Sequence, residues 1–315
     1  MSGEPVIVAR GLRKHYGSLV AVDGIDLAVR RGEIFGLLGP NGAGKTTTIL
    51  MLLGLTESSG GEISVCGFDP MRQPLEVKRR AGYLPDSVGF YDHLTARENL
   101  RYTGRLAGIG GAELDARVDD ALRRVRLSDV AQRRVRTFSR GMQQRLGLAE
   151  LVMKRSELAI LDEPTNGLDP QATFEFLDMI RGLKAAGVAV LLSSHILDRV
   201  QAVCDRVALF DRGRIVLEGR VRELAQQVLG GGYTVNVEVA PRAKAAELLR
   251  GVPGVRSVAE QGEGFVVLAE RDVRGDIARA ALTGGGELLR LDLVEPSLET
   301  IYRRHFEQEG DRAAA

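Results

Sequence analysis

A glycine-rich segment, GLLGPNGAGKTT at residues 36–47, holds residue types and spacing suited to binding phosphate. It fits the pattern GxxxxGK[ST] from Gly39 to Thr46, after an apolar run and before a helical pattern. Glycines let successive N–H groups surround phosphate oxygens, and the following helix start adds a positive dipole. Lys45 is expected at the β- and γ-phosphates, and Thr46 at Mg²⁺. The phosphate-binding set is Gly39, Asn41, Gly42, Ala43, Gly44, Lys45, Thr46 and Thr47. The alternative is a strand-to-helix turn with an incidental lysine.

A second acidic motif supplies what a nucleotide-hydrolysing site still needs. The run LAILDEP ends a buried strand pattern in Asp162 and Glu163. Such a site requires a carboxylate to hold the metal and a group to orient or deprotonate the attacking water. We therefore expect Asp162 to position Mg²⁺ and Glu163 to act on the water. Taken alone, an apolar run ending in Asp-Glu is also typical of a strand meeting a solvated loop.

A third motif, FSRGMQQR at residues 138–145, places Ser139 and Gly141 at the start of a helix, where anions bind favourably. Together the three motifs resemble those of the nucleotide-binding subunit of an ABC transporter, whose signature is LSGGQ. The order of these elements is met throughout residues 5–225. The resemblance implies a P-loop NTPase domain of α/β class that binds ATP with Mg²⁺ and hydrolyses ATP.

The resemblance also implies roles for residues that the spacing alone does not explain. Tyr16, in RKHYGS, matches the aromatic residue that stacks on adenine, and His195, in LLSSHILD, matches the histidine that senses the γ-phosphate. Ser139 and Gly141 match residues that contact the γ-phosphate bound by the opposite subunit. Asp169, in NGLDP, matches a residue at the dimer interface. Each of these residues could otherwise be structural.

The sequence departs from the family pattern in two places, the signature and the segment after GYLP. Arg140 and Met142 replace variable residues of the signature, while its serine and second glycine remain. Asp86 stands after GYLP, where the family usually has a glutamine that contacts Mg²⁺ and links to the membrane subunit. Asp86 is therefore counted with Thr46 and Asp162 as a metal ligand, and a plain turn residue is the alternative.

The secondary structure that positions these motifs is predicted from short, continuously apolar runs that are separated by helical patterns. Such runs predict strands buried on both faces of a mostly parallel sheet in a three-layer α/β domain. The runs lie at residues 33–39, 81–85, 158–162, 188–194 and 206–210. Few strand signals occur within 86–155, which predicts an inserted helical subdomain.

The pattern of predicted strands and helices changes near three consecutive glycines, and this change divides the chain into two domains. We expect a nucleotide-binding domain at 5–225 and a linker at 226–232, which contains Gly230, Gly231 and Gly232. A smaller α+β domain follows at 233–306, and its β-α-β-β-α-β order indicates a ferredoxin-like plan with a closing helix that Ser297 could cap. Residues 307–315 are expected to form a flexible tail.

Composition limits the partners that this chain can attract. Lys and Arg (43) nearly balance Asp and Glu (42), so no overall field favours nucleic acid or an anionic membrane. Cys66 and Cys204 are far apart in the sequence, without a CxxC motif, and indicate neither a disulfide framework nor a zinc site. No apolar stretch reaches the roughly 18 residues of a membrane span. A cytoplasmic location, peripheral on the inner face of the membrane through a membrane partner, fits these features.

The leading functional hypothesis is an ATPase subunit that works as a dimer, with a homodimer as the expectation, and powers a separate membrane permease. The ending VEPSLETIYRRHF resembles that of ATPases of bacterial two-component exporters. A soluble ABC ATPase acting on translation or DNA is an alternative, because the arginine-rich stretch 121–140 could contact phosphates. An importer ATPase with a regulatory C-terminal domain is another. No nucleic-acid partner is expected, and the cargo cannot be read from this chain.

Overall fold

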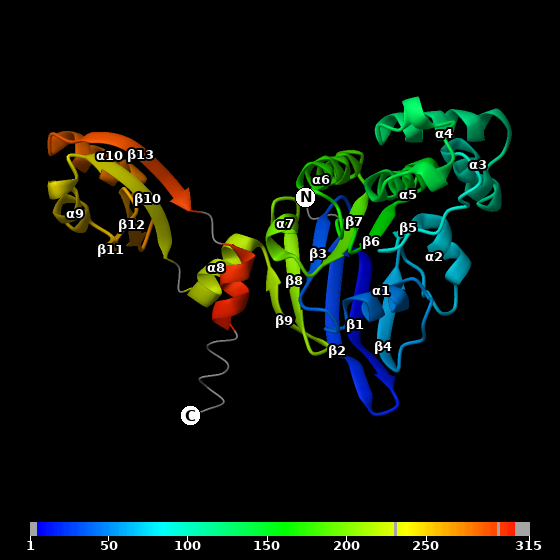
Figure 1. The fold of residues 1–315 in the computed structure, drawn as a ribbon. Helices are drawn as coiled ribbons and strands as arrows, with labels where there is room; N and C mark the ends of the chain where they lie inside the picture. Colours follow the sequence, from blue (N-terminus) through cyan, green and yellow to red (C-terminus); the bar gives the residue numbers. More distant parts are fainter. Residues whose placement is uncertain (1–4, 230–231, 295–296, 306–315) are drawn as a thin grey trace. The chain divides into compact units, whose positions relative to one another are not determined.

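The computed structural model describes residues 5–229, 232–294 and 297–305. The chain forms two compact units, Met1–Gly219 and Arg220–Ala315. Each unit has a hydrophobic core of its own. The units are therefore described separately, and Figure 1 shows their elements.

A six-stranded sheet organises the first unit. Its strands, in spatial order, are β5 (Ala81–Leu84), β6 (Leu158–Asp162), β7 (Ala189–Ser194), β3 (Ile34–Leu38), β8 (Arg206–Asp211) and β9 (Arg214–Gly219). Neighbouring strands are parallel except for the antiparallel pair β8 and β9. Every residue of β3, β6 and β7 is buried, which explains why these segments are continuously apolar. The expectation of a mostly parallel sheet is confirmed.

The first unit also contains an antiparallel sheet that the sequence analysis did not predict. It consists of β2 (Leu19–Arg30), β1 (Pro5–Tyr16) and β4 (Gly60–Val65), in that spatial order. Several buried positions of β1 and β2 alternate with more exposed ones, as in a sheet with one face on the core. That buried face shares one apolar cluster with the parallel sheet, including Ile7, Val22, Phe35 and Leu191. The two sheets therefore form one folded body.

Helices surround this body and form a lobe beside β5. The helices α1 (Lys45–Leu52), α2 (Pro74–Arg80), α6 (Pro170–Ala185) and α7 (Leu197–Gln201) connect the strands. The lobe contains α3 (Ala96–Leu106), α4 (Gly111–Arg124), two short 3-10 turns at Ser128–Val130 and Val135–Thr137, and α5 (Arg140–Lys154) (Figure 1). Thr95 and Glu98 form a reciprocal capping box at the start of α3. Within the described ranges, no helix is long and apolar enough to cross a membrane.

The second unit has a four-stranded antiparallel sheet with the order β11-β12-β10-β13. Its elements follow one another as β10 (Tyr233–Ala240), α9 (Arg242–Arg250), β11 (Val255–Gln261), β12 (Gly264–Ala269), α10 (Arg274–Thr283) and β13 (Glu287–Val294). This succession is the β-α-β-β-α-β plan of ferredoxin-like domains. Val237, Leu249, Phe265 and Ile277 belong to its buried core. A helix at residues 298–305 follows, and the Ser297 hydroxyl accepts hydrogen bonds from the N–H groups of Glu299 and Thr300.

The boundary between the units differs from the predicted one. It falls after Gly219 rather than after residue 225, and residues 226–229, which were expected to be linker, are the end of α8 (Val221–Leu229). The physical reason is amphipathic spacing: Leu224 and Val228, four residues apart, are both buried on this helix. Gly230 and Gly231 of the predicted linker, and the predicted tail at 307–315, lie outside the described residues.

Candidate active site

The phosphate loop lies between β3 and α1 and needs glycine at two positions. Gly39 has a φ of 148° and Gly44 a φ of 106°, conformations that side chains rarely adopt. A Cβ atom would lie 2.3 Å from the carbonyl oxygen of Phe210 at Gly39, and 2.5 Å from that of Ala21 at Gly44. Neighbouring backbone therefore shapes this loop closely. Asn41 and Gly42 are exposed at its tip, whereas Ala43 is buried and Thr47 is half-buried.

Lys45 is held inside the loop. Its Nζ atom donates hydrogen bonds to the carbonyl oxygens of Gly39 at 2.7 Å and Pro40 at 3.0 Å. The carboxylate of Glu163 is 3.6 Å away, and the lysine side chain is only 5% exposed. Burial lowers the pKa of Lys45, and the charge of Glu163 opposes this shift. A phosphate group at the loop would supply the anionic partners that this buried ammonium favours.

Asp162 joins the first turn of α1 to the ends of β6 and β7. Its Oδ1 atom accepts hydrogen bonds from the hydroxyls of Thr46 at 3.2 Å and Ser193 at 2.5 Å. Hydroxyl and carboxylate oxygens are ligands that Mg²⁺ prefers, and Mg²⁺ commonly takes only a few protein ligands beside substrate phosphates. Thr46 and Asp162 therefore fit a magnesium ion that enters with a nucleotide. No group of three or more His, Cys, Asp or Glu residues in the described segments could hold a metal by itself.

Glu163 and His195 lie beside Lys45, Thr46 and Asp162, and these five residues form the Lys45 cluster. The Nδ1 atom of His195 is 2.9 Å from Oε2 of Glu163, and the backbone N–H of His195 donates to the same oxygen at 3.3 Å. Glu163 itself has a φ of 48°, a left-handed conformation that is uncommon for a non-glycine residue. Such conformations cluster at functional sites. The carboxylate is thereby oriented between Lys45 and His195.

Ser193 is a site residue that the sequence analysis missed. Its hydroxyl donates to the carboxylate of Asp162 and accepts a 3.0 Å hydrogen bond from the backbone N–H of Glu163. One buried side chain thus fixes the spacing of both acids. Ser193 lies two residues before His195 at the end of a predicted strand, and this position could have indicated that it belongs to the site.

Ser139, Gly141 and Asp169 form a separate group on neighbouring helix starts. Ser139 caps α5 by accepting a hydrogen bond from the N–H of Met142, and Asp169 caps α6 in the same way from Ala172. A Cβ atom at Gly141 would lie 3.6 Å from that of Ala172. Within the described ranges, no hydrogen bond or ion pair joins Ser139 or Gly141 to the cluster around Lys45.

Tyr16 stands at the end of β1 with 48% of its surface exposed. The ammonium of Lys14 is 4.6 Å from its ring centroid. The ring is therefore accessible for stacking and already attracts a cation.

The carboxylate of Asp86 is bonded to groups outside the pair of Thr46 and Asp162. Its carboxylate accepts hydrogen bonds from Arg140 at 2.7 Å and Asn166 at 3.2 Å. Thr46 donates to Asp162, and within the described part of the chain no hydrogen bond joins Thr46 to Asp86. The reason is electrostatic, because the guanidinium of Arg140 offers a direct cationic partner.

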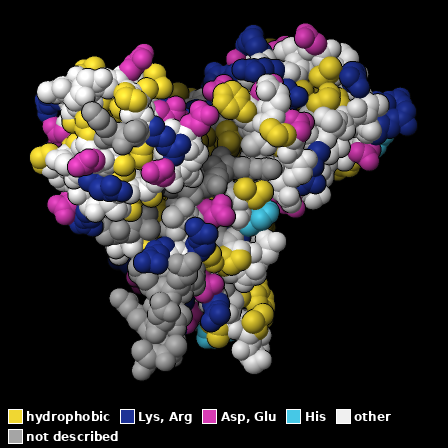
Figure 2. Space-filling model, turned by 60° about the vertical axis from the view of Figure 1, so that its left-hand side comes forward, with side chains coloured by type: hydrophobic (Ala, Val, Ile, Leu, Met, Phe, Trp, Pro, Cys, Tyr) yellow, Lys and Arg dark blue, Asp and Glu magenta, His cyan; other side chains and the backbone are white. Residues whose placement is uncertain are grey.

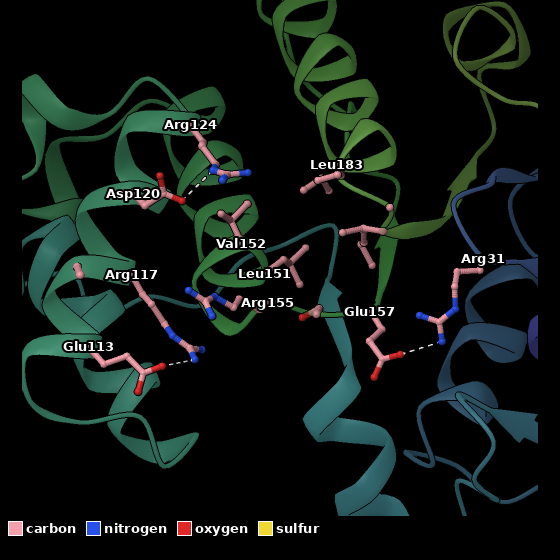
Figure 3. Close-up of a pocket in the computed structure, with 16 residues that line it drawn as sticks. Arg31, Glu113, Arg117, Asp120, Arg124, Leu151, Val152, Arg155, Glu157 and Leu183 are labelled. Carbon is pink, nitrogen blue, oxygen red and sulfur yellow. Dashed lines mark hydrogen bonds and ion pairs between the residues drawn. The ribbon is translucent and has the colours of Figure 1, made fainter.

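A cavity of about 500 Å³ in the first unit lies away from this cluster. It is lined at the beginnings of β6 and β7, by Glu157 and Val188, whereas Asp162 and Ser193 stand at the ends of these strands. Several of its charged side chains are already paired, including Arg124 with Asp120 and Arg31 with Glu157 (Figure 3). Part of the charged lining of this cavity is therefore neutralised within the chain.

Comparisons with known proteins lead to one family. The sequence profile described as "ABC transporter" matches residues 22–166. The linearmycin resistance ATP-binding protein LnrL of Bacillus subtilis (strain 168) is 33% identical over 309 residues, which cover 94% of this chain and 97% of that protein. The Nod factor export ATP-binding protein I of Ralstonia nicotianae is 38% identical over 226 residues, covering 72% of this chain and 70% of that protein.

A solved structure gives the same result for the fold. It is an ATP-binding subunit of an ABC transporter, is 32% identical, and covers 70% of this chain and 92% of its own, with a TM-score of 0.65. Sequence, sheet topology and phosphate loop therefore lead to one family. The chain belongs to the ATP-binding subunits of ABC transporters, and its enzymatic activity is ATP hydrolysis.

Proposed function

We propose that two copies of this chain bind ATP and Mg²⁺ between them and power export by a separate membrane-spanning permease. The observation that carries the proposal is the cluster of Lys45, Thr46, Asp162, Glu163 and His195, linked by hydrogen bonds and an ion pair at the end of the parallel sheet. Ligand sites in open α/β sheets occur at the carboxyl ends of the strands.

Each residue of the site has a separate role in ATP binding or hydrolysis. Lys45 binds the β- and γ-phosphates, and Tyr16 stacks on the adenine. Thr46 and Asp162 would hold Mg²⁺, which would supply positive charge to stabilise the phosphate oxygens. Glu163 accepts a proton from the attacking water, and His195 keeps that carboxylate oriented. Ser193 fixes the backbone of Glu163 relative to Asp162.

The second copy completes the site. Ser139 and Gly141 are not bonded to the Lys45 cluster of their own chain, and the serine begins a helix, where anions are stabilised. Contact of these residues with the γ-phosphate on the opposite copy would exclude water from the reacting groups. Hydrolysis then removes the bridge between the copies. Asp169 lies at this interface.

Export is favoured by the relatives and by the second unit. One relative is named for Nod factor export and another for linearmycin resistance, and the latter covers the second unit as well as the first. For the importer alternative, a regulatory domain without helices is the usual expectation, whereas this unit contains α9 and α10. A cytoplasmic position on the inner face of the membrane, held by the permease, follows from this proposal.

A nucleic-acid function has less support. In the arginine-rich stretch 121–140, Arg123 and Arg124 are paired with Asp120, and Arg140 is paired with Asp86. Figure 2 shows basic and acidic side chains interspersed over the face that it draws. These pairings reduce the free charge that the three arginines offer to a phosphate backbone.

Co-purification tests the proposal. Tagged Glu163→Gln protein is expressed in the native host, and the membranes are solubilised with ATP and Mg²⁺ present. We expect a multi-span membrane protein to co-purify, because this variant should bind ATP, fail to hydrolyse it and remain dimeric. Lys45→Ala, which should not retain ATP, is the control for nucleotide-dependent capture. Recovery of ribosomes or nucleic acid instead of a membrane protein would favour the soluble alternative.

A further inference from the structure

Two of the residues that depart from the family pattern, Asp86 and Arg140, are bonded to each other. Asp86 follows β5, and Arg140 is the first residue of α5. Nη2 of Arg140 lies 2.7 Å from Oδ1 of Asp86, and Nε of Arg140 donates to the carbonyl oxygen of Asn166 at 2.7 Å. Arg140 therefore connects the segment after β5 with the loop between β6 and α6.

Two further bonds fix Asp86 in this position. The side-chain amide of Asn166 donates to its carboxylate at 3.2 Å, and that of Gln144 donates to its backbone carbonyl oxygen at 3.0 Å. Gln144 is one turn beyond Arg140 on α5 and is only 1% exposed. Asp86 is thus bonded to two successive turns of α5 and to Asn166.

The loop between β6 and α6 has room for the arginine because residue 167 is glycine. Gly167 has a φ of 69°, and a Cβ atom there would lie 3.0 Å from Nε of Arg140. The guanidinium therefore fits against backbone that carries no side chain at this point. Ser139 and Gly141 flank Arg140 in the sequence.

The strength of this pair indicates what it does. The side chains of Arg140 and Asp86 are 44% and 46% exposed, and ion pairs with such exposure contribute little to stability. A charge-assisted bond with a second hydrogen bond to Asn166 does, however, fix orientation. The pair is better suited to holding the signature in place than to stabilising the fold.

We propose that Asp86 is a positioning residue rather than a metal ligand. It holds Arg140, and through it Ser139 and Gly141, against the loop that carries Asn166. This inference rests on the proposed composite site.

A double-substitution cycle tests the inference in the full-length chain. Asp86→Gln restores the residue that is usual in the family, Arg140→Gly restores the glycine of the LSGGQ pattern, and the double variant restores both. We expect each single change to lower the kcat of ATP hydrolysis roughly three- to tenfold, and the double variant to return toward the parent rate. The KM for ATP and the Mg²⁺ concentration for half-maximal rate should stay near the parent values.

Controls separate this inference from the proposed function. Arg123→Ala removes another exposed ion pair of the same lobe and should not change the rate. Thermal unfolding shows whether each variant is folded. Multiplicative losses in the double variant, or a higher Mg²⁺ requirement in Asp86→Gln alone, would overturn the positioning role. A parent protein that neither dimerises with ATP nor hydrolyses it would instead refute the composite site.

Discussion

At the scale of single residues, the site depends on groups that hold one another before any nucleotide arrives. Glu163 is placed by Ser193, His195 and Lys45, and Asp162 by Ser193 and Thr46. Preorganised groups need little rearrangement during the reaction. Small changes in these contacts should therefore affect the rate more than the stability.

Ser193→Ala tests this preorganisation. The substitution removes the hydroxyl that bridges Asp162 and the backbone of Glu163, and we expect the kcat for ATP hydrolysis to fall about tenfold or more, because small misplacements of reacting groups are costly. Steady-state ATPase assays measure the change. Ser156→Ala is the matched control, since its buried hydroxyl has no hydrogen-bond partner in the described residues. Equal losses in both variants would mean that any buried serine matters equally.

The lowered pKa of Lys45 predicts how ATP affinity depends on pH. In the free protein burial lowers this pKa below 10.5, whereas bound phosphate would raise it again. Affinity should therefore be fully present below the free-state pKa and should fall as the pH rises through it. ATP binding measured from about pH 7.5 to 10 checks this, with Lys45→Arg as a control that keeps its charge throughout. A profile as steep in Lys45→Arg would assign the effect to another group.

At the scale of elements, the phosphate loop is shaped by strands that it does not belong to. The carbonyl oxygen of Ala21, on β2, lies against Gly44, and that of Phe210, on β8, lies against Gly39. The antiparallel sheet and the parallel sheet thus both form walls of the loop. Its shape is a property of packed elements rather than of the glycine motif alone.

Gly44→Ala tests this packing. The new Cβ would lie 2.5 Å from backbone and adopt an unfavourable φ, so we expect a loss of about 1–3 kcal/mol in the free energy of unfolding without nucleotide. Gly42→Ala is the comparison, because its φ is also positive but nothing lies within 4 Å of the added atom. Denaturant unfolding should show the larger loss at Gly44. Equal losses in the two variants would mean that the positive φ, rather than the contact with the carbonyl oxygen of Ala21, causes the loss of stability.

At the scale of the whole molecule, all proposed nucleotide contacts belong to the first compact unit. The second unit has its own buried core and its own sheet. We therefore expect nucleotide to stabilise the first unit in particular. The second unit carries none of the proposed ATP-binding residues.

Calorimetry with and without nucleotide tests this division. A ligand at about 100 times its Kd stabilises the folded state by about 2.7 kcal/mol, which should raise one melting transition by roughly 5–10 °C. We expect the other transition to stay in place. Lys45→Ala should remove the shift. Movement of both transitions together would show that the units unfold cooperatively.

The sequence by itself determined the parallel strands, the phosphate loop and the paired acids, because continuous apolar runs and a fixed glycine-lysine spacing are local signals. The antiparallel sheet of β1, β2 and β4 was not predicted, because its strands are buried mainly on one face and lack a continuous apolar run. These strands are stabilised by packing in one core with Phe35 and Leu191. Only the tertiary structure brought Ser193 to Asp162 and Arg140 to Asp86, residues 31 and 54 positions apart. Such pairs depend on how strands and helices are placed in space, which no local pattern specifies.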